Sequence, residues 1–362
     1  MIQNNYCVIM AGGIGSRFWP MSRNAHPKQF IDILGSGKTL IRQTYERFKG
    51  ICPPENIYII TSDTYIGLVK KHLPECSDAQ IIAEPQRRNT APCVAYSAFK
   101  IFSNNPEANI VVAPSDHIVA DENRFRESIL KGLEFTAQQD CLLTIGIQPS
   151  RPDTGYGYIQ FKDQKHDGHF PIYKVKTFTE KPNLEMAKFF LKSGEFLWNS
   201  GIFLWKAKSI IKAFEEHLPD MYSIFKDGQS VYNTPGETEF IQHAYSQTIN
   251  ISVDYGIMEK AKNVYTMSAE FGWSDLGTWK SLYEHLQHDK DENAVVGPHV
   301  MLDNTKNCVV NIPGNKLAVI MGLDNYIVVE ADNVLLICPK DDEQQVRNIV
   351  NDVKIRKGEK YI

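Results

Sequence analysis

Residues 11–30 read AGGIGSRFWPMSRNAHPKQF, and this segment decides the fold class of the chain. It follows a short apolar run, residues 7–10, which predicts a buried strand. Glycines at positions 12, 13 and 15 let the backbone turn tightly and bring its N–H groups close to a ligand. Arg17 and Lys28 add two fixed cations beside that loop. Together these features predict a site for a highly charged anion such as a nucleoside triphosphate.

Two other glycine-rich phosphate motifs fail on their spacing. The dinucleotide fingerprint G-x-G-x-x-G would begin at Gly13, but Phe18 stands at its third glycine position. The Walker pattern G-x-x-x-x-G-K-[ST] is absent after this first strand. A plain tight turn and a nicotinamide-binding oxidoreductase with a degenerate loop stay open as weaker interpretations. The two cations argue against the turn, and the glycine spacing argues against the oxidoreductase.

The composition is that of an ordinary globular enzyme. The 362 residues leave room for one large or two moderate domains. With 39 basic and 43 acidic residues the net charge is −4, so no global field attracts nucleic acid. No apolar run approaches the roughly 20 residues that cross a bilayer, and the N-terminus lacks an export signal. The seven cysteines form no C-x-x-C pair. We therefore expect a cytoplasmic protein with no nucleic-acid or membrane partner.

Strand and helix patterns alternate along residues 1–150, which predicts an α/β fold with a mixed, mostly parallel sheet. The predicted strands are 7–11, 57–61, 80–83, 110–113 and 141–147. The predicted helices are 40–49, 64–73, 91–102 and 124–138. Ligands in such folds bind beyond the carboxyl ends of the strands. The sequence puts Gly12, Glu84, Ser115 and Asp116 at these ends.

The pattern of predicted strands and helices changes twice in the rest of the chain. Residues 150–290 are less regular, with strands predicted at 158–161, 172–179 and 202–205 and helices at 184–193, 207–217, 237–245 and 255–262. From residue 291, short β-rich pieces alternate with turn residues. These pieces are 294–296, 299–302, 308–311, 317–321, 326–329 and 334–338, and a helix is predicted at 343–353.

The pattern G-G-x-G-x-R-x-W-P, followed by P-K-Q-F, resembles the signature of sugar-1-phosphate nucleotidylyltransferases, in the form of the mannose-1-phosphate guanylyltransferase branch. The resemblance implies a Rossmann-like nucleotidyltransferase domain over residues 1–290. Its nucleotide-binding part would cover about 1–150 and its sugar-binding part about 150–290. A small C-terminal β-rich domain, β-helix-like, would cover 291–362. Some relatives continue into a cupin-like isomerase domain; since this chain stops at Ile362, we expect the short monofunctional form.

Two aspartates are candidate ligands of Mg²⁺. Asp116 lies in P-S-D-H after the strand at 110–113, and Asp275 lies in F-G-W-S-D-L-G-T-W, similar to the family motif W-S-D-x-G-x-W. Magnesium takes about six oxygen ligands, usually including one or two carboxylates. Either aspartate could instead cap a helix. For the helix that runs to residue 285, the cap would be Ser274 or Asp275. The resemblance implies Asp116 and Asp275 as the metal pair and as catalytic residues together with Arg17 and Lys28.

Residues 84–92, EPQRRNTAP, resemble the base-recognition segment of the guanylyl branch. The guanine edge offers N1–H and N2–H₂ donors, which a carboxylate such as Glu84 can accept. Asn89 also has suitable chemistry, but capping of the next helix by Asn89 or Thr90 stays open. The implied nucleotide-binding set is Ala11, Gly12, Gly13, Gly15, Ser16, Arg17, Glu84, Pro85, Asn89, Thr90 and Ser115.

Three further segments resemble the sugar-binding parts of the family: TGYGYI at 154–159, FTEKP at 178–182 and WNSG at 198–201. Glu180 can accept from two adjacent sugar hydroxyls, while the Asn199 amide can both donate and accept. A hairpin turn at 154–159 and a surface Glu180–Lys181 pair stay open, and Asp254 most simply caps its helix. The implied sugar-phosphate-binding set is Lys28, Gly155, Tyr156, Glu180, Lys181 and Asn199.

The resemblance implies transfer of GMP from GTP to mannose 1-phosphate, giving GDP-mannose and pyrophosphate by Mg²⁺-assisted in-line attack on the α-phosphate. The attacking phosphate oxygen is already ionised near pH 7, because the second pKa of such a group is about 6, so no general base is required. Another hexose 1-phosphate or another nucleotide stays open, as does an inactive nucleotide-sugar-binding regulatory subunit. Relatives are commonly dimers, which implies a homodimer.

Overall fold

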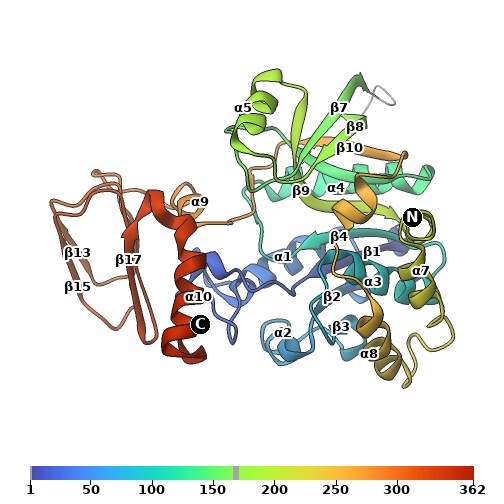
Figure 1. Ribbon diagram of the computed structural model, residues 1–362, viewed down its shortest axis with the longest axis horizontal. Helices are drawn as coiled ribbons and strands as arrows, with labels where there is room; N and C mark the ends of the chain where they lie inside the picture. The colour runs from blue at the N-terminus through green and yellow to red at the C-terminus, as the bar shows by residue number, and fades with distance from the viewer. Residues whose placement is uncertain (1, 166–170) are drawn as a thin grey trace. The chain divides into compact units, whose positions relative to one another are not determined.

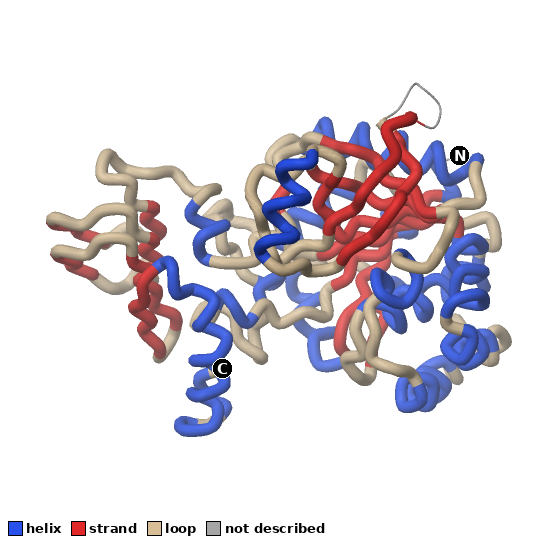
Figure 2. Tube along the Cα trace, turned by 45° about the horizontal axis from the view of Figure 1, so that its top comes forward, coloured by secondary structure: helices blue, strands red, loops and turns tan. Residues whose placement is uncertain are grey.

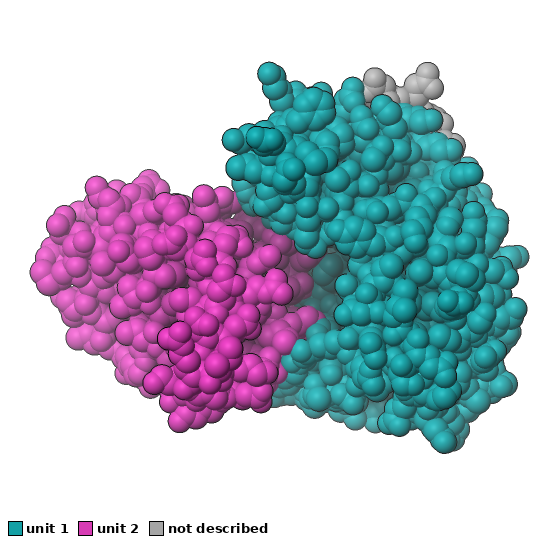
Figure 3. Space-filling view, in the orientation of Figure 1, with its two compact units in different colours: residues 1–12, 44–115, 119–273 teal, residues 13–43, 116–118, 274–362 magenta. Residues whose placement is uncertain are grey.

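A computed structural model describes residues 2–165 and 171–362. The chain packs into two compact units, coloured separately in Figure 3. Unit 1 comprises residues 1–12, 44–115 and 119–273, and unit 2 comprises residues 13–43, 116–118 and 274–362. The predicted domain boundary near residue 290 stays a prediction.

Unit 1 is built on a mixed nine-stranded sheet in the order β3-β2-β1-β4-β9-β6-β10-β8-β7 (Figure 1). Strands β3, β2, β1 and β4 are parallel to one another, whereas β9 is antiparallel to both β4 and β6. The expected α/β class with a mixed sheet is confirmed. The bounds are β1 (Asn5–Met10), β2 (Ile57–Ser62), β3 (Ile81–Glu84), β4 (Asn109–Pro114), β6 (Leu142–Ile147), β7 (Tyr158–Lys165), β8 (Ile172–Thr179), β9 (Phe196–Lys206) and β10 (Val264–Ala269).

Helices cover both faces of this sheet. Leu142 and Phe203 join the core beneath α3 and α6, whereas their neighbours Leu143 and Leu204 lie against Gly132 of α4. This alternation follows because successive strand residues point to opposite faces. The helices are α2 (Ile66–His72), α3 (Thr90–Asn104), α4 (Glu122–Gln138), α5 (Leu184–Ser193), α6 (Ala207–His217), α7 (Pro219–Lys226) and α8 (Glu237–Gln247), while α1 (Leu40–Phe48) spans the division at residue 43.

The C-terminal part of unit 2 is a short β-helix-like stack of strands (Figure 2). The chain alternates between two sheets: β12, β14 and β16 pair in parallel in one, and β13 and β15 pair in parallel in the other. Strand β17 closes the larger sheet in antiparallel fashion. The expected β-helix-like fold is therefore confirmed. The strands are β12 (Ala294–Val296), β13 (Val300–Asp303), β14 (Val309–Asn311), β15 (Ala318–Met321), β16 (Tyr326–Ala331) and β17 (Val334–Pro339).

Residues 13–43 belong to the packed core of unit 2. Phe18 packs against Trp279 of α9 (Trp279–Tyr283), with ring centroids 5.0 Å apart, in a cluster that includes Ile327 of β16. Trp19 packs with Val346 at the start of α10 (Val346–Lys357), and its Nε1 donates to the Tyr361 carbonyl at 2.6 Å. The loop after β1 and the C-terminal helix are thus parts of one body.

Some predicted elements differ from the structure. The helix predicted at 255–262 is a single π-helical turn, Asp254–Met258. The helix predicted at 343–353 begins three residues later, because a 3-10 helix, Lys340–Gln345, precedes α10. All seven cysteines are free thiols. Among the described residues, no helix has the length and apolar character needed to cross a membrane.

Candidate active site

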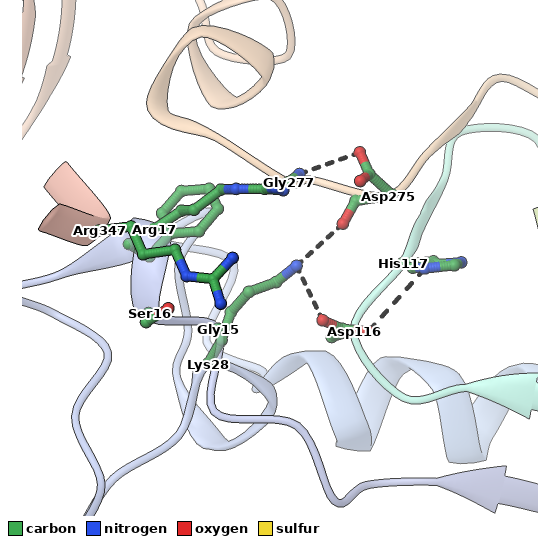
Figure 4. Close-up of a pocket in the computed structure, with 10 residues that line it drawn as sticks. Gly15, Ser16, Arg17, Lys28, Asp116, His117, Asp275, Gly277 and Arg347 are labelled. Atoms are coloured by element: carbon green, nitrogen blue, oxygen red, sulfur yellow. Dashed lines mark hydrogen bonds and ion pairs between the residues drawn. The ribbon is translucent and has the colours of Figure 1, made fainter. Parts of the chain in front are cut away.

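Unit 2 contains a pocket of about 260 Å³ that gathers the four predicted catalytic residues (Figure 4). Arg17 comes from the glycine loop and Lys28 from the 3-10 turn that follows it. Asp116 follows β4 in sequence, and Asp275 follows β11 (Trp273–Ser274). The structure thus joins segments that are more than 200 residues apart. The other lining residues are Gly15, Ser16, Phe18, His117, Gly277 and Arg347.

Lys28 connects the two aspartate segments. Its Nζ lies 2.9 Å from Asp116 Oδ2 and donates to the carbonyls of Asp275 at 2.9 Å and Leu276 at 2.8 Å. These contacts use all three ammonium protons, and only 3% of the side chain is exposed. Burial raises the pKa of Asp116, but the charges of Lys28 and His117 outweigh it and hold that pKa below its usual value. The Asp116 carboxylate is therefore ionised at neutral pH.

Neither aspartate caps a helix. Helix α9 is capped by Thr278, whose Oγ1 accepts from Ser281 N at 3.2 Å, so the alternative in which Ser274 or Asp275 begins the helix is wrong. Helix α4 is capped by Asp121, which accepts from Arg124 N at 2.9 Å. Asp275 instead accepts from Gly277 N at 3.0 Å and lines the pocket. Both carboxylates are thus placed for a role other than capping.

The glycine loop turns its carbonyl groups toward the segment that carries Lys28. The Ile14 carbonyl accepts from Lys28 N at 3.2 Å and from the Ser22 hydroxyl, and the Gly13 carbonyl accepts from Gln29 Nε2 at 3.0 Å. In a trans peptide the C=O and the following N–H point in opposite directions. The N–H groups of Ile14 and Gly15 therefore face away from that segment, as an anion-binding loop requires.

Replacement of Gly15 by alanine should destabilise the fold by about 2 kcal/mol or more. Gly15 has φ of +72°, and a Cβ there would lie 2.6 Å from Lys28 Cβ, so the change strains the backbone and displaces Lys28. Gly13→Ala is the matched control, because a Cβ at Gly13 meets no atom within 4 Å. Urea unfolding of the two variants checks this. Equal stability of both would contradict the assigned role of Gly15.

In unit 1, Glu84 ends β3 at the carboxyl edge of the sheet, where a base-recognition group was predicted. It is 8% exposed, and its Oε1 accepts from the Tyr245 hydroxyl at 3.0 Å. Burial raises the pKa of Glu84 to about 7, while the Tyr245 hydrogen bond and the charge of Arg87 act in the opposite direction. A Cβ at Gly12 would lie 3.4 Å from Glu84 Oε2, so the glycine keeps the backbone open beside this carboxylate.

Helix α3 begins at the predicted cap. Asn89 is its N-cap: the side-chain oxygen accepts from Thr90 N at 2.9 Å, and the residue has φ of +68°. The Thr90 hydroxyl accepts from Val253 N at 2.9 Å. The capping interpretation of Asn89 is thus confirmed, and its contact with a base stays a prediction.

The predicted sugar residues of unit 1 form one cluster around Gly157. A Cβ at Gly157 would clash with Glu180 Oε2, so the glycine leaves room for that carboxylate. Asn199 N donates to the Gly157 carbonyl at 2.8 Å, and Lys181 N donates to the Tyr156 carbonyl at 3.2 Å. The backbone of the loop therefore positions Glu180 and Asn199 together. The Lys181 Nζ donates to Glu180 Oε1 at 2.6 Å, so the Glu–Lys pair exists as well.

Asp254 also belongs to this cluster, although the sequence did not predict that it would. It opens the π-helical turn, but no side chain caps that turn; the carboxylate accepts instead from Asn199 Nδ2 at 2.9 Å. Burial and the charge of Glu180 raise the pKa of Asp254 to about 6. The prediction that Asp254 caps its helix is therefore wrong. Its role is to hold the amide of Asn199, whose Oδ1 accepts from the Thr144 hydroxyl at 3.0 Å.

The predicted nucleotide-binding residues divide between the units. Four of them belong to unit 2, namely Gly13, Gly15, Ser16 and Arg17. The remaining seven belong to unit 1, namely Ala11, Gly12, Glu84, Pro85, Asn89, Thr90 and Ser115. Sequence reasoning missed Arg347 in the pocket and Tyr245 beside Glu84. Neither lies in a recognisable motif, and Arg347 is an exposed residue of helix α10.

Comparisons with known proteins show the family of the chain. The profile of the nucleotidyl transferase family matches residues 6–292, and that of the MannoseP isomerase/GMP-like beta-helix domain matches residues 297–353. The chain is 34% identical to a mannose-1-phosphate guanylyltransferase of Salmonella montevideo, over 98% of this chain and 75% of that protein. It is 33% identical to mannose-1-phosphate guanylyltransferase 2 of Escherichia coli O157:H7, over 98% and 74%.

A solved structure resembles the whole chain as well. The structure described as mannose-1-phosphate geranyltransferase from Thermus thermophilus matches with a TM-score of 0.86 at 29% identity, covering 97% of this chain and all of that one. The chain therefore belongs to the nucleotidyl transferase family. Within that family it is similar to the mannose-1-phosphate guanylyltransferases, so the resemblance seen in the glycine loop is confirmed.

Proposed function

We propose that the protein transfers GMP from GTP to mannose 1-phosphate, forming GDP-mannose and pyrophosphate. The observation that carries this proposal is the pocket of unit 2, in which Arg17, Lys28, Asp116 and Asp275 meet. Two carboxylates and two cations beside a glycine loop suit the charge of a metal-bound triphosphate. The curated relatives named as guanylyltransferases of mannose 1-phosphate supply the choice of base and sugar.

Members of this family generally use a divalent metal, and the pocket suits Mg²⁺. Asp116 is ionised, and Asp275 lines the same space with its carboxylate. The described residues include no group of three or more metal-binding side chains, so two carboxylates would act with phosphate oxygens and water, as is usual for Mg²⁺. When bound by Asp116 and Asp275, Mg²⁺ would neutralise charge on the reacting phosphates.

The chain's own groups would align the phosphates and lower their repulsion. Arg17 and the N–H groups of the glycine loop would bind the leaving β- and γ-phosphates. Lys28, held by Asp116, would supply positive charge rather than a proton, because its three N–H donors already have protein acceptors. Catalysis would then rest on orientation and charge stabilisation without a general base.

Recognition of the two organic groups would fall to unit 1. The Glu84 carboxylate would accept from guanine N1–H and N2–H₂, and Tyr245 would fix its orientation. Glu180, Lys181 and Asn199 would bind the sugar phosphate, with Asp254 holding the Asn199 amide. The homodimer and the cytoplasmic location stay predictions.

The experiment that tests the reaction measures pyrophosphate release with Mg²⁺, mannose 1-phosphate and each of the four common nucleoside triphosphates in turn. Release with GTP alone supports the proposal. Release with a different nucleotide would move the base assignment away from Glu84 and Asn89. No release with any nucleotide, repeated with other hexose 1-phosphates, would contradict the proposed activity.

The KM for GTP should fall as the pH rises through about 7. Glu84 has a pKa of about 7, and only its ionised form accepts two hydrogen bonds from guanine. Stability should change in the opposite direction: because the folded-state pKa is raised, this group stabilises the fold below about pH 4 and that contribution is lost as the pH rises to about 7. Glu84→Gln should flatten both profiles. An unchanged pH profile of KM in that variant would contradict the assignment.

A further inference from the structure

We propose that Arg347 of helix α10 is a second pyrophosphate-binding arginine, which completes with Arg17 the anion site of the unit 2 pocket. The inference rests on the proposed nucleotidyl transfer, but not on which base or sugar is used. It makes the C-terminal helix a part of the phosphate site rather than only of the β-rich end of the chain.

The packing of unit 2 brings Arg347 to the pocket. The preceding residue, Val346, is 2% exposed and packs against Trp19 and Leu336. Trp19 lies two residues after Arg17, and its indole nitrogen donates to the Tyr361 carbonyl. The first turn of α10 is therefore fixed against the same short segment that carries Arg17. Both arginine side chains line the pocket beside Lys28 in Figure 4.

The carboxylates of the pocket form no ion pair with the guanidinium groups of Arg17 and Arg347. Lys28 is paired with Asp116, whereas neither Arg17 nor Arg347 forms a salt bridge with any side chain that the structure describes. The charge of Arg17 acts on the buried Glu343, but the Glu343 carboxylate accepts from Lys280 N at 2.8 Å and forms no ion pair with Arg17. Arginine is always charged and binds phosphate through two parallel N–H donors. Two guanidinium groups that have no carboxylate partner suit a ligand with two linked phosphates.

Direct binding of Mg²⁺-pyrophosphate, measured by isothermal titration calorimetry, tests the inference without a nucleotide or a sugar. Arg347→Ala should weaken binding about tenfold or more, because a charge-assisted bidentate contact is lost. Arg347→Lys should give an intermediate affinity, since it keeps the charge but not the fork. Arg356→Ala is the matched control: Arg356 is exposed on the same helix, about 13 Å further along its axis.

In the reverse reaction, the KM for pyrophosphate should rise by a similar factor in Arg347→Ala. The thermal unfolding midpoint of this variant should equal that of the wild type. Wild-type affinity in Arg347→Ala, or an equal loss in Arg356→Ala, would overturn the inference. So would the absence of pyrophosphate binding by the wild type. If no nucleotide yields product while pyrophosphate binding still depends on Arg347, the proposed reaction fails and the anion site stands.

Discussion

Asp275→Asn should lower kcat by about a thousandfold, which corresponds to about 4 kcal/mol of transition-state stabilisation. The amide keeps the size of the carboxylate and can still accept from Gly277 N, which now lies 3.0 Å from Asp275 Oδ1. The loop between β11 and α9 should therefore keep its shape, since Thr278 and not Asp275 caps the helix. What is lost is one of two negative charges that would hold Mg²⁺.

The design separates loss of the metal ligand from loss of the fold. Asp303→Asn is the control, because Asp303 is exposed at the end of β13 in the same unit. It should keep kcat within a factor of two, and both variants should unfold at the wild-type midpoint. The Mg²⁺ concentration for half-maximal rate should rise in Asp275→Asn alone. A kcat near that of the wild type at saturating Mg²⁺ would contradict the assignment of Asp275.

Lys28→Met should reduce both stability and turnover, and the two losses have different causes. Removal of the ammonium leaves Asp116 and the carbonyls of Asp275 and Leu276 without their donor. Because Lys28 is buried but the Asp116 side chain is 31% exposed, loss of this ion pair should cost about 2 kcal/mol. Turnover should fall by about a hundredfold or more, because the charge that reduces repulsion between two anionic substrates is gone. Urea unfolding and steady-state kinetics measure the two effects.

A double-mutant cycle separates the structural part of this loss from the catalytic part. In Lys28→Met with Asp116→Asn, the uncompensated charge is absent, so stability should recover in part. Turnover should not recover, since both the cation and a metal ligand are missing. Lys290→Met controls for loss of a lysine, because its side chain is 91% exposed. Near-normal turnover in Lys28→Met would contradict the role of Lys28.

Much of the fold could be predicted because its elements carry local signals. The apolar runs at 57–61 and 110–113 became β2 and β4 within one residue at each end, and helices at 184–193 and 207–217 were predicted with their observed bounds. The π-helical turn at Asp254 was missed, since its hydrogen-bond pattern differs from that of an α-helix by one residue and leaves the same apolar spacing.

The candidate site was predictable where motifs exist and not elsewhere. Arg17, Lys28, Asp116 and Asp275 lie in segments that resemble family signatures, and the structure brings them to one pocket. The attachment of residues 13–43 to the C-terminal strands depends on Phe18 and Trp19 meeting partners more than 250 residues away. No local pattern encodes such a contact, so the sequence could not point to Arg347.

The most direct test of the central claim follows the oxygen atoms of the sugar phosphate. The protein is incubated with Mg²⁺, GTP and mannose 1-phosphate labelled with ¹⁸O in its phosphate, and both products are analysed by mass spectrometry. The account predicts GDP-mannose that carries all of the label, together with an equal amount of unlabelled pyrophosphate, because a sugar-phosphate oxygen attacks the α-phosphate of GTP. Label in pyrophosphate, or pyrophosphate formed without GDP-mannose, would contradict it.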